Sequence, residues 1–356
     1  RRRYQRPHTR VLGRHGRRYR HSDPHNPDPC VVGLRGCRAK LKCNPSPIPV
    51  VPLNMSSSTR SRRTVLVTAP GSNRASFGAV EWGLLVAVAA IWGSSFLFIA
   101  EGLESFEPAF ITAGRFGLGL MTLAAFPAAR RPIPRHDWAG IALIGIVWMA
   151  LPMYLFPVAQ QWISSSLAGM INGAVPLFAA LVAALLLRSR PRRIQVVGLL
   201  VGFCGVVMVS DRGGSSTENG NLGVGLLLLA VMCYGVGVNV AVPLQQRHGA
   251  LPVLLRSLVI AAALTLPLGL VSLPTEAVTA GSVAALLALG SLGTGIAFVA
   301  MTTLVGRVGA TRGAVATYFI PIVALALGVV FRNEEAPLVS LVGIASILVG
   351  AWLVSR

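Results

Sequence analysis

Long apolar runs separated by short polar segments fill the chain from residue 80 to its end. A transmembrane helix needs about 20 mostly apolar residues. By that measure the sequence predicts spans near 82–100, 107–127, 138–156, 166–187, 194–210, 222–242, 252–272, 281–301, 310–331 and 338–355. We therefore expect an all-α integral membrane protein of ten transmembrane helices.

The second half of this pattern repeats the first. The segment 164–187 resembles 308–331, and the match of Pro176 with Pro321 sets an offset of 145 residues. The same offset carries Gly198 onto Gly343 and Gly205 onto Gly350, and at the start of each half Trp92-Gly93 corresponds to Tyr234-Gly235. Each half has five spans, an odd number, so the second copy must be inverted in the membrane. Inverted repeats are common in secondary transporters, so we expect two five-helix inverted repeats at 81–211 and 221–356 and a transport function.

The composition agrees with a membrane protein. Of the 356 residues, 53% are hydrophobic and 12% are charged, and the mean hydropathy is +0.66. Soluble domains carry about 25% charged residues, and this chain has too little polar surface to cover a soluble fold of its size. The lipid bilayer is therefore an expected partner.

The arginines between the spans predict an orientation. With a cytoplasmic N-terminus, eleven loop and terminal arginines are cytoplasmic, and only Arg212 and Arg332 lie on the other side. Cytoplasmic loops of membrane proteins carry an excess of basic residues. We expect a multi-pass protein of the cell membrane (inner or plasma) with both termini in the cytoplasm, which requires an even number of spans.

Residues 1–80 form a basic head rich in arginine, proline and serine. Residues 1–76 hold 17 of the 32 basic residues and supply +15 of the net charge of +20. Because the charge is concentrated here, it does not indicate nucleic-acid binding by the rest of the chain. We interpret the head as disordered and attracted to anionic lipid. The alternatives are a targeting segment and a mis-assigned start, with Met55 as the candidate true start and residues 1–54 foreign to the native protein.

Polar side chains inside the spans are the candidates for a solute site. Arg115 lies about seven residues into the second span, and a charge at the bilayer centre costs about 2.5–3.5 kcal/mol or more. Two roles are open for Arg115, binding a substrate carboxylate and snorkelling to the interface; for Arg256 we favour snorkelling and the capping of carbonyls.

The full candidate cavity is aromatic and rich in neutral hydrogen-bonding groups, which suits a zwitterionic or amphipathic small molecule. Helix–helix hydrogen bonding is the alternative role of five of its residues, Tyr154, Asn172, Tyr234, Asn239 and Tyr318. For Trp92 the alternative is a packing plug. The candidates are Trp92, Ser94, Ser95, Arg115, Tyr154, Asn172, Tyr234, Asn239 and Tyr318.

Two further patterns bear on movement and association. Pro176 and Pro321 remove a helical hydrogen bond, so we expect kinks that serve either as paired hinges or as static shape. Gly198-x-x-x-Gly202 and Ser346-x-x-x-Gly350 predict close helix contacts. These contacts join either the two halves or two subunits, so a homodimer is one of the two expectations.

Sequence motifs of other functional classes are missing. The chain contains no HExxH, no GxSxG and no Walker sequence, so we expect no catalysis and no direct use of ATP. The five cysteines lack the paired spacing of zinc sites, and we expect no metal and no cofactor. Deeply placed carboxylates and histidines are also missing, so facilitated exchange is at least as well supported as proton antiport. A membrane-embedded enzyme and a channel-like protein are the alternatives to a transporter.

Over residues 80–355 the sequence resembles the EamA-type transporters of the drug/metabolite transporter superfamily. The resemblance rests on IWGSSFLF (91–98), on GRFGLG (114–119), and on two proline-bearing spans that each precede a glycine-spaced helix, VVGLLVGFCGVVMV and LVGIASILVGAWLV. It implies ten helices, a central cavity between the halves, and export or exchange of amino acids or similar small metabolites. Members of that family often have a glutamate shortly after the fourth span. This chain has Arg188, Ser189 and Arg190 there, whereas the second half keeps Glu334 and Glu335.

Overall fold

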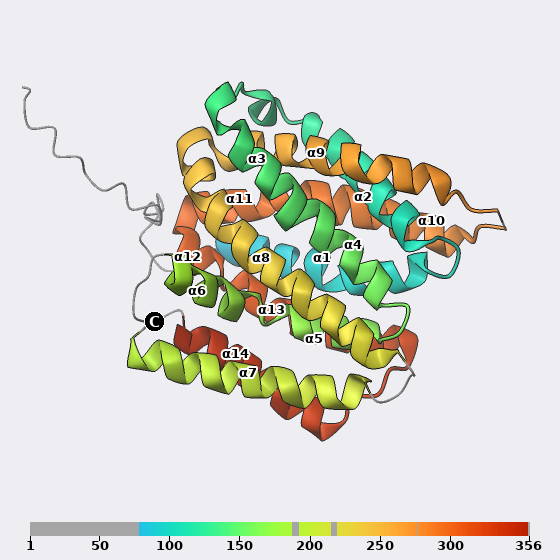
Figure 1. The fold of residues 1–356 in the computed structure, drawn as a ribbon, viewed down its shortest axis with the longest axis vertical. Coiled ribbons are helices and arrows are strands. Elements are labelled where there is room, and N and C mark those ends of the chain that lie inside the picture. Colours follow the sequence, from blue (N-terminus) through green and yellow to red (C-terminus); the bar gives the residue numbers. More distant parts are fainter. Residues whose placement is uncertain (1–77, 187–191, 215–218, 276, 355–356) are drawn as a thin grey trace, which may run out of the picture. The chain divides into compact units, whose positions relative to one another are not determined.

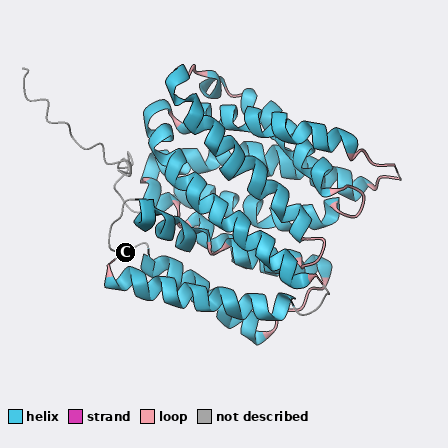
Figure 2. Cartoon of the chain, in the orientation of Figure 1, coloured by secondary structure: helices cyan, strands magenta, loops and turns pink. Residues whose placement is uncertain are grey.

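A computed structural model describes residues 78–186, 192–214, 219–275 and 277–354, and every regular element within them is a helix (Figures 1 and 2). The all-α class predicted from the sequence is therefore confirmed for this part of the chain. The basic head up to residue 77 lies outside the described residues, as do Arg188, Ser189 and Arg190 after the fourth predicted span.

The helices before residue 215 cover the region of the first predicted repeat. They are α1 (Ala79–Gly102), α2 (Pro108–Ala124), the 3-10 turns η1 (Pro127–Arg130) and η2 (Arg135–Asp137), α3 (Trp138–Ile144), the π-helix η3 (Gly145–Ala150), α4 (Leu151–Ala159), α5 (Ser165–Asn172), α6 (Val175–Leu186) and α7 (Arg193–Gly214).

The helices from residue 219 onward cover the region of the second predicted repeat. They are α8 (Gly220–His248), α9 (Ala250–Val271), α10 (Ala280–Leu287), the π-helix η4 (Ala288–Ile296), α11 (Ala297–Val308), α12 (Ala310–Gly313), α13 (Ala316–Arg332) and α14 (Leu338–Val354).

Each predicted apolar range lies on these helices. Within the described residues, six helical segments are long and apolar enough to cross a membrane: Ala79–Gly102, Arg135–Ala159, Ser165–Leu185, Gly220–His248, Ala250–Val271 and Ala280–Val308. Shorter apolar helices cover Arg193–Val209, Ala316–Arg332 and Leu338–Val354. The protein is therefore a multi-pass membrane protein.

The two proline-bearing spans are interrupted helices. Residues 173–174 separate α5 from α6, and Pro176 is the second residue of α6. Because proline has no N–H, the carbonyl of Asn172 loses its usual helical donor, and the chain breaks here instead of continuing as one bent helix. In the other span, residues 314–315 separate α12 from α13, and Pro321 lies inside α13.

These two breaks do not coincide under the sequence repeat. Adding the offset of 145 to residues 173–174 gives 318–319, four residues after the break at 314–315. Four residues are about one helical turn. The two copies of this span therefore have different local conformations.

The π-helices occupy matching places in the two halves. The offset of 145 carries Gly145 of η3 onto Gly290 of η4. A Cβ on Gly145 would lie 3.0 Å from the carbonyl oxygen of Ser257 in α9, and one on Gly290 would lie 3.1 Å from that of Arg115 in α2. Each π-helix thus packs backbone to backbone against a helix of the other half. Short π-helical turns are frequent at functional sites.

The contact between α7 and α14 uses the glycines noted in the sequence. A Cβ on Gly198 would lie 2.8 Å from the carbonyl oxygen of Gly350, and one on Gly205 would lie 2.5 Å from that of Gly343. Only glycine allows such close approach of two helices. The two glycine patterns therefore meet within this chain, and they join its two halves.

Ion pairs join the two halves at one end of the helical bundle, where α1 ends and α2 begins (Figure 1). Arg332, at the end of α13, pairs with Glu101 at 3.0 Å and with Glu104. We call this end the acidic end; its acidic residues are Glu101, Glu104, Glu107, Glu334 and Glu335.

Two further pairings lie at the opposite end, which we call the basic end; its basic residues include Arg130, Arg131, Arg135, Arg247 and Arg307. Asp137, which is almost fully buried, contacts Arg247 at 2.9 Å and His248 at 2.6 Å. Glu81 contacts Arg307 at 2.6 Å. Both pairings link a helix before residue 215 to one after residue 219.

Candidate functional site

A polar group lies in the middle of the helical bundle, where α1, α2 and η4 meet. Arg115 is 7% exposed, and its Nε donates a 2.8 Å hydrogen bond to the Thr294 hydroxyl. Trp92 donates from its indole N–H to the carbonyl of the preceding residue, Gly293, at 3.0 Å. We call Trp92, Arg115, Gly293 and Thr294 the central cluster.

Arg115 has no carboxylate partner among the described residues. An arginine side chain has five N–H donors, and here only the Nε–H has a partner in the described part of the chain. A buried charge is costly unless it is paired. The remaining donors of Arg115 are therefore available to an anionic group that enters the cluster.

Aromatic rings surround the central cluster. Trp92 meets Phe298 edge to face at a centroid distance of 5.5 Å. On the other side, Tyr234 of α8 stacks on Phe156 at 5.9 Å and lies within electrostatic range of Arg115. Trp92 and Tyr234 correspond in the predicted repeat, so an aromatic residue from the same position of each half packs against a phenylalanine, Phe298 or Phe156.

Other predicted cavity residues have structural partners. Asn239 donates to the carbonyls of Ala179 at 2.9 Å and Gly235 at 2.8 Å, and this links α8 to α6. Tyr318 donates to the carbonyl of Ala351 in α14 at 3.2 Å. These two residues do what the alternative role of helix–helix hydrogen bonding predicts.

The remaining candidates fall into two groups. Ser94 and Ser95 both donate to the carbonyl of Ile91 at 3.0 Å, although Ser95 also lies against Gly293 of the central cluster. Tyr154 and Asn172 are half-buried, and their side chains have no hydrogen-bond partner in the described segments. The structure thus gathers Trp92, Ser95, Arg115 and Tyr234, and leaves the other five candidates outside the cluster.

Arg256 does not belong to this site. Its Nη1 donates to the carbonyls of Ala129 at 3.2 Å and Pro252 at 3.1 Å. The interpretation of Arg256 as a residue that caps neighbouring carbonyls is confirmed.

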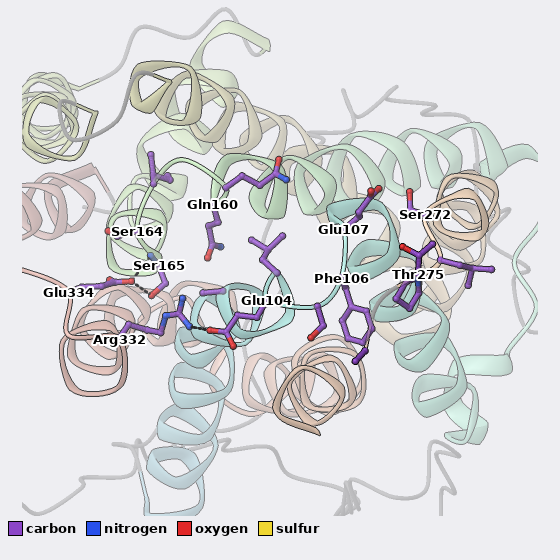
Figure 3. Close-up of a pocket in the computed structure, with 18 residues that line it drawn as sticks. Glu104, Phe106, Glu107, Gln160, Ser164, Ser165, Ser272, Thr275, Arg332 and Glu334 are labelled. Atoms are coloured by element: carbon purple, nitrogen blue, oxygen red, sulfur yellow. Dashed lines mark hydrogen bonds and ion pairs between the residues drawn. The ribbon is translucent and has the colours of Figure 1, made fainter. Parts of the chain in front are cut away.

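A cavity of about 600 Å³ opens at the acidic end (Figure 3). Its polar lining comes from the loops after α1, α4, α9 and α13, and includes Glu104, Ser105, Glu107, Gln160, Gln161, Ser164, Ser165, Ser272, Thr275, Arg332 and Glu334. We call it the acidic vestibule. In Figure 3, Glu334, Ser165 and Arg332 gather on one side of the view and Ser272 and Thr275 on the other, with Gln160 and Glu104 between them.

The carboxylate of Glu334 caps the start of α5. One oxygen accepts from the backbone N–H of Ser165 at 2.9 Å and from its hydroxyl at 2.7 Å, and the other accepts from the N–H of Ser166 at 2.8 Å. Helix N-termini favour negative charge because their first N–H groups have no partner in the helix. Glu334 therefore fixes the loop after α13 to a helix of the first half.

Sequence reasoning missed Gly293 and Thr294, because neither is unusual in an apolar segment. A usable signal was present: the offset of 145 aligns Gly293 with Trp148, a residue that also contacts Phe298, at 6.1 Å. The described residues contain no group of three or more His, Cys, Asp or Glu side chains that could hold a metal ion.

Comparisons with known proteins agree with this arrangement. The model of the EamA-like transporter family matches residues 81–211 and again residues 221–356. The chain is 28% identical to the uncharacterized inner membrane transporter YedA of Escherichia coli K12, over 77% of this chain and 90% of that protein. It is 21% identical to an uncharacterized transporter of Archaeoglobus fulgidus, over 78% of this chain and 99% of the other.

A WAT1-related chloroplastic protein of Arabidopsis thaliana is 24% identical over 78% of this chain and 69% of its own length. One crystal structure of a protein superposes with a TM-score of 0.55 at 20% identity, covering 77% of this chain and 95% of the other, which shows a shared fold. The relatives are named as transporters, and together with the apolar helices they identify a membrane transporter and point away from an enzyme. The chain belongs to the EamA-like transporter family.

Proposed function

We propose that this protein is a secondary transporter that exports or exchanges a small metabolite, an amino acid or a similar zwitterionic or amphipathic solute, by alternating access. The observation that carries the proposal is the guanidinium of Arg115, which is 7% exposed and has no carboxylate partner among the described residues. Arginine binds carboxylates through paired, charge-assisted hydrogen bonds. The solute's carboxylate takes these donors, and its side chain packs between Trp92 and Tyr234.

The proposed architecture is ten transmembrane helices in two inverted repeats, residues 81–211 and 221–356. Two observations support it. The same family model matches both segments. In addition, the offset of 145 carries Gly198 onto Gly343 and Gly205 onto Gly350, so it converts the contact between Gly198 and Gly350 into the contact between Gly343 and Gly205. A two-fold axis in the membrane plane has this effect on contacts between halves.

Alternating access requires contacts between the halves to break at one end at a time. Pairings between the halves occur at both ends, through Asp137 and Glu81 at the basic end and through Arg332 at the acidic end, and a cavity of about 600 Å³ lies at each end. We assign the acidic end to the outside of the cell membrane and both termini to the cytoplasm, which follows the arginine distribution. Pro176, next to the break at residues 173–174, and Pro321, inside α13, act as the hinges.

The proposed partners are the small-molecule solute and the lipid bilayer. The glycine patterns give no support to a homodimer, because they meet within the chain.

Uptake by reconstituted vesicles tests this function. Inside-out vesicles would be given labelled amino acids, nucleosides and cationic drugs, with and without a proton gradient. We expect saturable uptake of one class, lost in Arg115→Ala and partly kept in Arg115→Lys. Arg256→Ala is the matched control, since Arg256 only caps carbonyls. The proposal would be overturned if correctly inserted protein took up no solute, or if Arg115→Ala took up the solute as well as the unchanged protein does.

A further inference from the structure

Among the described residues, the acidic vestibule offers no free cationic group to an anion. Arg332, the one basic residue of the described lining, already pairs with Glu101 and Glu104. The other natural anion site, the start of α5, is filled by the carboxylate of Glu334 at 2.8–2.9 Å from two backbone N–H groups. A carboxylate that enters the vestibule therefore meets positions that the chain's own carboxylates occupy.

The lining of the acidic vestibule carries more negative than positive charge. The described residues of the lining contain three carboxylates, Glu104, Glu107 and Glu334, against the single guanidinium of Arg332. Glu107 is exposed and has neither an ion pair nor a hydrogen bond from its side chain in the described segments. A concave surface of one sign raises the local concentration of the opposite charge. The vestibule thus attracts cations.

A buried side-chain amide without a hydrogen-bond partner also lines the acidic vestibule. Gln160 caps the C-terminus of α4, lines the vestibule and is 9% exposed. Both its Oε1 and its Nε2 are buried without a hydrogen-bond partner. A buried amide that lacks partners is destabilising, because it has lost its hydrogen bonds to water. A ligand that supplies an N–H donor and a carbonyl acceptor relieves this destabilisation, because it pairs with both atoms of the amide.

We propose that the acidic vestibule is a binding site for solutes that carry a protonated amine next to a hydrogen-bonding carbonyl, and that it rejects solutes whose only charge is a carboxylate. The ammonium group is held by the surplus negative charge, chiefly by the unpaired carboxylate of Glu107. The carbonyl accepts from the Gln160 amide. The inference rests on the proposed transport function, since it names the chemistry of the solute that first meets the protein on the acidic side.

Charged thiol reagents measure whether the vestibule favours cations over anions, and the experiment does not require that the transported solute be known. Gln161, which is exposed and lines the vestibule, would be replaced by cysteine. Asn221, which is exposed near the start of α8 and does not line it, gives the matched control Asn221→Cys. Two methanethiosulfonate reagents would be used, one that carries a cationic trimethylammonium group and one that carries an anionic sulfonate. Their reaction with the new cysteine would be followed by mass spectrometry in full-length protein in vesicles.

For each cysteine we compare the labelling rate of the cationic reagent with that of the anionic reagent. We expect this ratio to be about tenfold higher at position 161 than at position 221, which is the lower end of the increase that a charged cleft produces in the local concentration of the opposite charge. Glu107→Gln lowers the ratio at position 161. Glu335→Gln, which removes an exposed carboxylate of the same end that does not line the vestibule, leaves it unchanged. Equal ratios at the two positions overturn the proposal.

Protection of the same cysteine tests the ligand chemistry. Glycinamide would be used at pH 6, below the usual α-amino pKa of about 8, so that its amine is protonated. It should slow labelling at position 161 in a saturable way, whereas N-acetylglycine, whose only charge is its carboxylate, should not. Gln160→Leu should remove the protection and keep the rate ratio, because it leaves the carboxylates in place. Absence of protection by glycinamide, or equal protection by N-acetylglycine, overturns the proposal.

The two proposals fail separately in these experiments. Arg115-dependent uptake together with a vestibule that shows neither charge preference nor protection overturns the vestibule site alone. A vestibule that behaves as expected, in a correctly inserted protein that takes up no solute, supports the amine site and overturns the transport proposal alone.

Discussion

Arg115 of α2 and Thr294 of η4 are joined by a 2.8 Å hydrogen bond across 179 residues of sequence. The bond ties the second span to the π-helix of the other half, whose residue Gly290 packs against the backbone of Arg115 itself. The charged residue at the centre of the protein is therefore positioned by a hydroxyl from the opposite half.

Thr294→Val tests this positioning role. Valine keeps the shape of threonine but cannot accept the Nε–H, and hydrogen bonds to charged groups contribute about 1.5–3 kcal/mol. We expect a lower thermal unfolding midpoint in detergent and a raised KM for the transported solute. Thr303→Val is the control, because Thr303 is exposed and donates only within its own helix. Equal behaviour of the two variants would contradict the role of Thr294.

Gly350→Ala tests the packing of α7 on α14. The new Cβ would lie 2.5 Å from both the carbonyl oxygen of Gly198 and the N atom of Gly202, so the two helices must separate. Overpacking of this kind costs about 1–3 kcal/mol, and we expect a lower unfolding midpoint. Gly225→Ala in α8 is the matched control, because nothing lies within 4 Å of its Cβ. There the higher helix propensity of alanine should stabilise by up to about 1 kcal/mol. A Gly350→Ala midpoint as high as that of Gly225→Ala would rule out the tight contact.

Cross-linking at the basic end tests whether that end must open. Glu81 and Arg307 approach to 2.6 Å and come from opposite halves. The double variant Glu81→Cys/Arg307→Cys, joined by a short bifunctional thiol reagent, should lose transport, and reduction should restore it. The single variants treated in the same way are the controls. Full transport by the cross-linked protein would show that this contact need not break.

Pro321→Ala tests the hinge role. Alanine restores the missing N–H inside α13, so the helix should become straighter and no less stable. We expect the maximal uptake rate to fall while KM changes little, because movement is the step affected. Pro267→Ala in α9 is the control, since that proline also lies inside a helix but beside no break. An unchanged rate in Pro321→Ala would favour static shape over a hinge.

Much of the fold could be read from the sequence because the bilayer imposes a simple rule on length and polarity. Every predicted apolar range lies on helices, and the Gly198 and Gly350 patterns meet, since both depend on local composition. The π-helices were not foreseen, because they depend on how η3 and η4 pack against α9 and α2. The same holds for Glu334: its residue type was visible in the sequence, but its attachment to Ser165 depends on how distant loops meet.

The candidate site was foreseen in part for a related reason. A charge in an apolar span is conspicuous, so Arg115 and the neighbouring Trp92 were found. Asn239 and Tyr318 are equally conspicuous, but their partners are backbone carbonyls of α6 and α14, which a sequence does not reveal. Gln160 lies outside the spans and became a candidate only because its amide is buried without a partner.

The helix breaks at residues 173–174 and 314–315 differ by one turn under the proposed repeat. Two copies of one sequence pattern therefore adopt two backbone states in the same molecule. If each half took the state of the other, α5 would shorten by about one turn and α12 would lengthen by about one turn. The protein thus already contains, in the opposite half, the local geometry that each half would adopt in such an exchange.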